Sequence, residues 1–378
     1  MHDGGGQVRV RDGPESAEAP APGVLPVDRG SRPAAESASR GRRGRVNVSF
    51  VAWSEDGDRA EEIAAALGGE ARIFYDLHIV SKPLVPLRYA LSAVRMVAYL
   101  ARRRPQALIV TNPPIFPGLL GFAYGRLAGA AVVLDSHPSA FGDAALAKAT
   151  MSVHAWLARR ATTTLVTVEP LAEIVRNWGG AADIIHEARP RYTVRHATPL
   201  TARPRVLYIG RFAGDEPTAE VLDAARLTPQ VDLRVTGDVR KCPPGLRSSA
   251  PANAIFTGFL RGDDYRRAMD EADIVLVLTN HPMAVNRGAY EAVYSRRPLI
   301  ISDLPAMRPL FPHAIRVAND ASSIAEGIQT AVRDHAALVE AADDALADQE
   351  QRWRDQLDCL RARVGGGLDG ARDREILC

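Results

Sequence analysis

The stretch that decides the fold runs from residue 273 to residue 305 and reads DIVLVLTNHPMAVNRGAYEAVYSRRPLIISDLP. Residues 274–278 form an apolar run of the length expected for a buried parallel strand, and residues 299–301 predict the next strand. Between them a polar loop leads into a helix over residues 286–296, which Pro298 ends. This order of elements is typical of an open α/β sheet, in which ligands bind at the carboxyl ends of the strands.

Three polar side chains of this helix, Asn286, Arg287 and Glu291, are predicted to face a ligand. Free N–H groups at the amino-terminus of a helix suit a phosphate. We therefore expect the three residues to face a sugar nucleotide. The alternative is that Glu291 is a solvated carboxylate on the helix surface.

Composition bounds the class of protein. The 378 residues are 46% hydrophobic and 24% charged, which predicts two domains with sizeable cores. A formal net charge of +2 predicts no nucleic-acid partner. The three cysteines have neither paired nor metal-ligand spacing, which predicts a reducing, cytoplasmic location. No run of eighteen apolar residues occurs, so we expect no membrane span.

The chain divides into four predicted parts. Residues 1–45 contain no aromatic residue and no Ile, and we expect a disordered leader there. Strands and helices alternate over residues 46–198 and again over residues 199–335. Residues 336–378 predict helices followed by a Gly-rich, frayed tail from residue 364. The predicted fold class is α/β, with two Rossmann-like, doubly wound parallel-sheet domains facing a cleft.

A long helix over residues 84–104 has an apolar stripe with an arginine edge. The stripe consists of Leu84, Leu87, Leu91, Val94 and Ala98, and Arg88, Arg95 and Arg102 run along its edge. Two interpretations stay open: the stripe packs against the protein, or it rests on an anionic bilayer. The second would place the protein at the inner face of a membrane, and the apolar segment 115–122 favours it.

Polar residues also follow strands in the amino-terminal half. Asp135 and His137 come after a predicted strand over residues 131–134, a position well suited to a binding site. Asp56, Gly57 and Asp58 match the DxD pattern that holds a divalent metal in some enzymes. Turn residues before a helix more often form a turn and an N-cap, so we predict no metal site.

Several short patterns, in the right order over residues 45–335, resemble glycosyltransferases of the GT-B fold, family 4. They are VLYIGR at 206–211, FTGF at 256–259 with Tyr265 and Ala272-Asp273, YEAV at 290–293 with RPLI at 297–300, and TNPP at 111–114 with LDSH at 134–137. The last pair is similar, more distantly, to the mannosyltransferases that extend dolichol-linked chitobiose. Each pattern alone is weak, and the ordered set is fairly specific.

The resemblance implies retaining transfer of a hexose from a UDP- or GDP-sugar to a saccharide, lipid-linked or small-molecule acceptor. The amino-terminal domain would take the acceptor and the carboxyl-terminal domain the nucleotide sugar, with no cofactor and no metal. Glu291 would bind the ribose, Arg211 the diphosphate, and His137 the sugar. Gly210, Gly258 and Asp135 fall in the matching motifs and are predicted to line the substrate site.

Two positions depart from the family pattern. Met283 stands where an acidic residue is usual, and Glu216 stands where a phosphate-binding lysine is usual. Arg287, with His281 as a further candidate, is predicted to replace the lysine. The departures keep two alternatives open: a catalytically inactive GT-B nucleotide-binding or scaffold subunit, and a sugar-nucleotide epimerase of the same fold.

Overall fold

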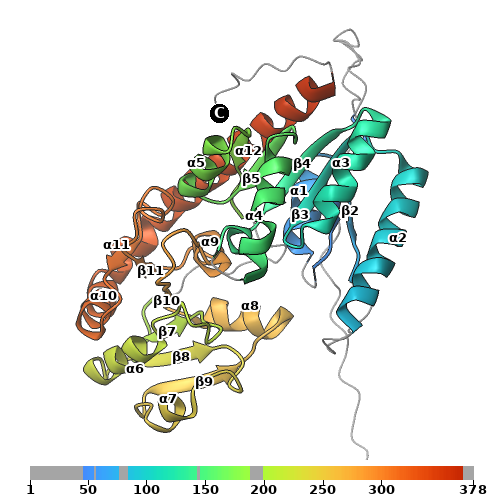
Figure 1. Cartoon of the computed structure of the whole chain (residues 1–378). Coiled ribbons are helices and arrows are strands. Elements are labelled where there is room, and N and C mark those ends of the chain that lie inside the picture. Colours follow the sequence, from blue (N-terminus) through green and yellow to red (C-terminus); the bar gives the residue numbers. More distant parts are fainter. Residues whose placement is uncertain (1–45, 55–56, 76–83, 143–144, 188–198, 369–378) are drawn as a thin grey trace, which may run out of the picture. The chain divides into compact units, whose positions relative to one another are not determined.

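The computed structural model describes residues 46–54, 57–75, 84–142, 145–187 and 199–368 (Figure 1). The predicted leader, Asp56 and the last ten residues lie outside the described part. Two six-stranded sheets, in which every pair of neighbouring strands is parallel, form the described chain together with the helices that flank them. The predicted fold class is therefore confirmed.

The first sheet has the strand order β2-β1-β3-β4-β5-β6. Its strands are β1 (Val48–Ala52), β2 (Glu70–Ile73), β3 (Ala107–Asn112), β4 (Ala131–Ser136), β5 (Thr163–Val166) and β6 (Ala182–Ile184). The helices of this part are α1 (Asp58–Ala66), α2 (Val85–Arg103), α3 (Phe116–Ala128), the 3-10 turn η2 (Pro138–Ala140), α4 (Ala145–Ala158) and α5 (Glu169–Asn177). β4 is buried along its whole length, which explains its nearly continuous apolar sequence.

The second sheet has the strand order β12-β11-β10-β7-β8-β9. Its strands are β7 (Arg205–Tyr208), β8 (Asp232–Thr236), β9 (Ala254–Gly258), β10 (Ile274–Val277), β11 (Leu299–Ser302) and β12 (Ile315–Val317). Its helices are α6 (Thr218–Leu227), α7 (Pro244–Ser248), α8 (Gly262–Glu271), α9 (Arg287–Tyr294), α10 (Ala321–Arg333) and α11 (His335–Glu340). The order reverses between β7 and β10, and such a reversal opens a crevice at the carboxyl ends of the two strands.

The last described helix, α12 (Ala342–Leu368), packs against β4 and β6 of the first sheet and also against α9 and α11, which flank the second sheet. Arg363 donates a hydrogen bond of 2.7 Å to Asp183 of β6, and Gln356 accepts one from the backbone N–H of His186 at 3.0 Å. These contacts and the burial of Val364 hold the helix beyond residue 364. The prediction that the tail frays from residue 364 is therefore wrong up to Leu368.

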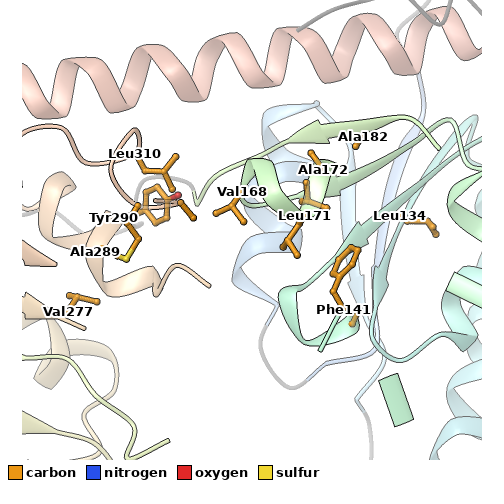
Figure 2. Close-up of a cluster of buried hydrophobic side chains, with 14 of the residues drawn as sticks. Leu134, Phe141, Val168, Leu171, Ala172, Ala182, Val277, Ala289, Tyr290 and Leu310 are labelled. Atoms are coloured by element: carbon orange, nitrogen blue, oxygen red, sulfur yellow. The ribbon is translucent and has the colours of Figure 1, made fainter. Parts of the chain in front are cut away.

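One hydrophobic cluster draws on elements of both sheets (Figure 2). Leu134 comes from β4, Val277 from β10 and Tyr290 from α9, and each is almost completely buried. Figure 2 labels these side chains together with Leu171 of α5 and Leu310. The apolar cores beneath the strand ends of the two sheets are thus continuous, so the helices that carry the candidate site are well supported.

The apolar stripe of α2 faces the solvent. Leu84, Leu87, Leu91, Val94 and Ala98 are all exposed, whereas the helix packs through Ser92, Met96 and Leu100 on its opposite side. Packing of the stripe against the protein, one of the two interpretations of the sequence, is therefore wrong for the described residues. Contact with a bilayer stays a prediction.

No helix in the described part of the chain is long and apolar enough to cross a membrane. Cys242 is a free, buried thiol. The cytoplasmic location stays a prediction.

Candidate active site

Asp135, at the end of β4, is held by a buried arginine. The guanidinium of Arg59 donates to both carboxylate oxygens at 3.0 to 3.2 Å. It also donates to the backbone oxygens of Ile185 and His186, both at 3.0 Å. Burial alone would lower the pKa of Arg59, but the carboxylates of Asp135 and Glu187 raise it above its ordinary value. Arg59 is thus a fixed cation, which the sequence analysis missed because the residue lies 76 positions before Asp135.

His137 follows two residues later and is exposed. Its backbone N–H donates to the oxygen of Asn112 at 2.8 Å. Ring atom Nδ1 accepts the backbone N–H of Ser139 at 3.2 Å, so a neutral ring carries its hydrogen on Nε2. Partial desolvation lowers the pKa of His137, and the cations of Arg59 and Arg211 lower it further. The ring is therefore neutral at pH 7 and presents Nε2–H as a donor.

A buried pair of side chains supports this segment from behind. The hydroxyl of Ser136 lies 2.9 Å from Nε2 of His154, which belongs to α4. Burial lowers the pKa of His154 to about 4. The ring is therefore uncharged at neutral pH, and it ties the end of β4 to α4 without reaching the solvent.

The loop after β7 is organised by Glu216. Its carboxylate accepts the backbone N–H groups of Arg211 at 2.8 Å and Ala213 at 3.2 Å, and the side chain is only 1% exposed. The side chain of Arg211, in contrast, is 67% exposed, with Nε 3.7 Å from the same carboxylate. Gly210, just before it, donates its N–H to the hydroxyl of Thr236 at 3.1 Å. Glu216 therefore shapes the loop from within, and Arg211 extends from it.

Helix α9 places Asn286 at its N-cap and Glu291 in its second turn. Glu291 is buried, accepts the hydroxyl of Tyr265, and lies 3.0 Å from Nε of Arg287, one turn earlier. The alternative of a solvated carboxylate is therefore wrong. The sequence analysis missed both partners, although the spacing of four residues between Arg287 and Glu291 is a known signal for a helical ion pair.

Arg287 also lies close to acidic residues of the first half of the chain, which follow strands β1 and β6. Its guanidinium lies 3.3 Å from Glu62, 3.7 Å from Asp58 and 4.0 Å from Glu187. Burial alone would lower the pKa of Arg287, but these carboxylates and that of Glu291 raise it above its ordinary value. The strand ends of the two sheets therefore meet at this cation.

The remaining predicted site residues lie in a loop or at a strand end of the second sheet. Nδ1 of His281 accepts the backbone N–H of Met283 at 3.2 Å, so the ring folds onto its own loop. The thioether of Met283 is partly buried against the main hydrophobic cluster. Gly258 ends β9 with a φ of +78° and accepts the N–H of Gly237 at 3.1 Å. None of these contacts brings His281 or Gly258 to Arg287.

Within the described ranges, no group of three or more His, Cys, Asp or Glu side chains is arranged to hold a metal ion. Of the DxD pattern, Asp56 lies outside the described residues. Asp58 is in the first turn of α1, where its carboxylate lies near Arg287.

Comparisons with known proteins agree with this architecture. Residues 29–191 match the family of the glycosyl transferase 4-like domain. HepE from Anabaena, solved with UDP and glucose, superposes with a TM-score of 0.64 at 16% identity over 86% of this chain and 100% of that one. Sucrose-phosphate synthase from Thermosynechococcus elongatus gives 0.61 at 15% identity, over 82% and 99%. The lipopolysaccharide outer core galactosyltransferase WaaB gives 0.53 at 14% identity, over 86% and 99%. No curated protein sequence matches the chain significantly.

The matched domain and the fold together define the class of protein: a glycosyltransferase of the GT-B fold, similar to family 4. The resemblance stated from the sequence and the assignment as a transferase enzyme are confirmed at this level.

Proposed function

We propose that the protein transfers a hexose from a UDP- or GDP-sugar to a saccharide, lipid-linked or small-molecule acceptor, with retention of the anomeric configuration. The observation that supports the proposal is that side chains following strands of the first sheet contact side chains following strands of the second sheet. His137 follows β4, and Arg211 follows β7 of the second sheet. Arg287 of α9 lies 3.3 Å from Glu62 of α1.

The chemistry assigns a role to each group. Negative charge grows on the leaving nucleoside diphosphate as the bond from the anomeric carbon to the phosphate oxygen breaks. The exposed guanidinium of Arg211 is suited to bind that charge, and Arg287 and the N–H groups at the start of α9 are further candidates. Cations and N–H groups can stabilise this leaving group, so we propose a reaction that requires no metal.

Sugar and ribose contacts follow from the same arrangement. The neutral ring of His137 offers Nε2–H to a hydroxyl of the transferred hexose. Glu291 is held by Tyr265 and Arg287 at the start of α9, a position suited to accept the ribose hydroxyls. Asp135, already bound by Arg59, would act on the substrate by fixing the loop that carries His137.

UDP is the first donor base to test, because HepE has a similar fold and its solved structures contain UDP, UDP with glucose, or UDP-glucose. Thermal unfolding would be measured with UDP, GDP and a panel of their sugars. A ligand present at about 100 times its Kd stabilises a protein by about 2.7 kcal/mol, which is readily measured. The nucleotide that stabilises the chain would then be used as a donor, with sugar release as the readout.

A second candidate function, an inactive nucleotide-binding or scaffold subunit, is favoured by one observation. Around Arg59 and Arg287 the carboxylates outnumber the guanidiniums; they belong to Asp58, Glu62, Asp135, Glu187 and Glu291. Such an excess of negative charge opposes a diphosphate. Stabilisation by a nucleotide without sugar release from any donor would support the subunit. No stabilisation by any nucleotide would contradict the donor site itself.

A further inference from the structure

Helices α2 and α3 lie side by side and run in the same direction on one face of the first sheet. The rings of Tyr89 and Phe116, near the start of each helix, have centroids 5.3 Å apart. Near the other end, the hydroxyl of Tyr124 donates to the oxygen of Pro105 at 2.8 Å. The two helices are therefore neighbours along their length.

Helix α3 packs on the sheet through glycines and turns its large apolar side chains outward. A Cβ at Gly125 would meet Val132 of β4 at 2.5 Å, and one at Gly121 would meet Val110 of β3 at 3.3 Å. Phe116 and Leu119, on the opposite side, are exposed. The core thus uses the small side of this helix, and the large apolar side stays exposed in the described part of the protein, apart from the contact of Phe116 with Tyr89.

Helix α2 repeats this arrangement, with its buried side formed by Ser92, Met96 and Leu100. We call the exposed surface of both helices the α2–α3 face; it consists of Leu84, Leu87, Leu91, Val94, Val97, Phe116 and Leu119. Several large apolar side chains exposed on two neighbouring helices are typical of a protein or membrane contact.

A basic groove borders the α2–α3 face along the edge of the first sheet. The groove, of about 650 Å³, lies between β2 and α2 and is lined in part by Arg72, Arg95, Arg102 and Arg103. Arg103 pairs with Glu70. Arg95 and Arg102 belong to the arginine edge of the apolar stripe, so the groove and the stripe adjoin each other.

The segment that contains α2 and α3 carries charges of one sign. Between residues 84 and 134 the sequence contains six Arg and neither Asp nor Glu. The whole chain has a net charge of only +2, so the remaining residues are net negative. This local excess of cations complements an anionic partner and disfavours association with a second, identical basic face.

We propose that the α2–α3 face rests on a bilayer of anionic phospholipid. The apolar side chains enter the boundary between headgroups and acyl chains, and the groove receives lipid phosphates through Arg72, Arg95 and Arg102. Arginine suits this task because its planar guanidinium binds phosphate through two parallel hydrogen bonds.

The α2–α3 face also begins at the edge of the first sheet where the carboxyl ends of the strands carry the candidate site. Trp53, directly after the carboxyl end of β1, has its ring centroid 6.1 Å from that of Tyr89 in the first turns of α2. The start of α2 therefore lies at the same edge of the sheet as Asp135 and His137. If the proposed function is right, the bilayer would bring a lipid-linked acceptor to this edge. Membrane binding itself does not depend on that function.

Sedimentation of the full chain with vesicles tests the proposal. Vesicles of phosphatidylcholine with about 30% phosphatidylglycerol should carry the protein down at low salt, and vesicles of phosphatidylcholine alone should carry far less. Raising the salt to about 0.5 M should release most of it, because exposed charges are then screened.

Two pairs of variants separate the charged and apolar contributions. Arg95→Gln with Arg102→Gln should weaken binding about 25-fold, because each basic residue near an anionic bilayer contributes about five-fold. Lys241→Gln with Arg247→Gln, both exposed beside the second sheet, should change nothing. Leu87→Gln should weaken binding about tenfold. Its matched control is Leu227→Gln, because Leu227 is 53% exposed and Leu87 is 51% exposed.

Three results would overturn the proposal. The first is a protein that stays in solution with anionic vesicles at low salt. The second is equal binding to neutral and anionic vesicles. The third is a dimer in sedimentation velocity that Leu87→Gln dissociates while vesicle binding is unaffected, because the face would then belong to a second copy of the chain. None of these measurements uses the transferase activity, so the proposed function can fail without affecting them.

Discussion

Two arginine–glutamate pairs lie at the strand ends of the second sheet, and their partners differ. Glu216 uses its carboxylate on the backbone N–H groups of Arg211 and Ala213, which leaves the guanidinium of Arg211 mostly exposed. Glu291 binds the guanidinium of Arg287 directly, and carboxylates of the first sheet approach the same cation. Arg211 can therefore bind an anion directly, whereas Arg287 can bind one only if it gives up contacts with carboxylates.

This difference changes the meaning of Glu216. From the sequence, a carboxylate in place of the family's lysine is expected to weaken the binding of a diphosphate. In the structure the carboxylate points inward and builds the loop that presents Arg211. We therefore propose that a loop held by these two hydrogen bonds partly offsets the absence of the lysine. The balance between the two effects can be measured residue by residue.

The largest expected effect is that of Arg211→Ala. If this cation binds the leaving diphosphate, its removal should lower kcat by about 10² to 10³, as for other preorganised donors in active sites. Steady-state turnover with the donor found by thermal shift checks this. Arg240→Ala is the control, because Arg240 is exposed in the same half of the chain and pairs with Asp238. Equal turnover in Arg211→Ala and the wild type would show that the exposed cation is not the one that matters.

Next in size is the effect of Glu216→Ala on stability. The substitution leaves the N–H groups of Arg211 and Ala213 without their acceptor, which should lower the free energy of unfolding by about 2 to 3 kcal/mol. Chemical denaturation monitored by circular dichroism measures it. Asp263→Ala, which removes an exposed carboxylate from α8, should change stability by less than about 0.5 kcal/mol. If both variants were equally stable, Glu216 would not organise the loop.

A smaller effect is expected when a carboxylate that competes with the nucleotide for Arg287 is removed. Glu62→Gln removes one of the carboxylates near its guanidinium and should tighten nucleotide binding about five-fold, a typical size for a partly exposed ion pair. Glu61→Gln is the matched control, because Glu61 is the preceding residue of the same helix and is exposed. Isothermal titration gives both affinities. Weaker nucleotide binding in Glu62→Gln would mean that Glu62 orients the guanidinium of Arg287 for the nucleotide rather than competing with the nucleotide for it.

The sequence predicted the fold well because its signals are local. Apolar runs such as residues 274–278, followed by a polar loop and a helix, determine a parallel strand and its crossover wherever the unit sits. Arg287 and Glu291 were candidates because they lie on a helix that follows a strand end, whereas Arg211 was a candidate only through the resemblance to the family.

The partners of these residues could not be found from local patterns. Arg59 and Asp135 are 76 positions apart, and Glu62 and Arg287 are 225 positions apart, so only the tertiary fold brings them together. A carboxylate that accepts backbone N–H groups, as Glu216 does, leaves no trace in the sequence. The stripe of α2 was ambiguous for another reason, because an apolar helix face has the same periodicity whether it meets a core or a bilayer.

The smallest effect should appear on the other side of the site, at His137. Desolvation and the cations of Arg59 and Arg211 lower the pKa of this ring, whereas Asp135 and Glu187 oppose them. Removing the positive charge in Arg211→Gln should therefore move the pKa of His137 upward, toward its ordinary value. Titration of the ring by NMR measures the change.

The control for this titration is Arg240→Gln, whose cation is not among those that act on the ring. An unchanged pKa in Arg211→Gln would mean that Arg211 and His137 do not share one electrostatic environment in solution. The upward shift also has a functional sign. A higher pKa protonates Nδ1 at a higher pH, and this would break the hydrogen bond from Ser139 that fixes the ring. As the pH is lowered, any activity that needs the neutral ring should therefore be lost at a higher pH in Arg211→Gln than in Arg240→Gln.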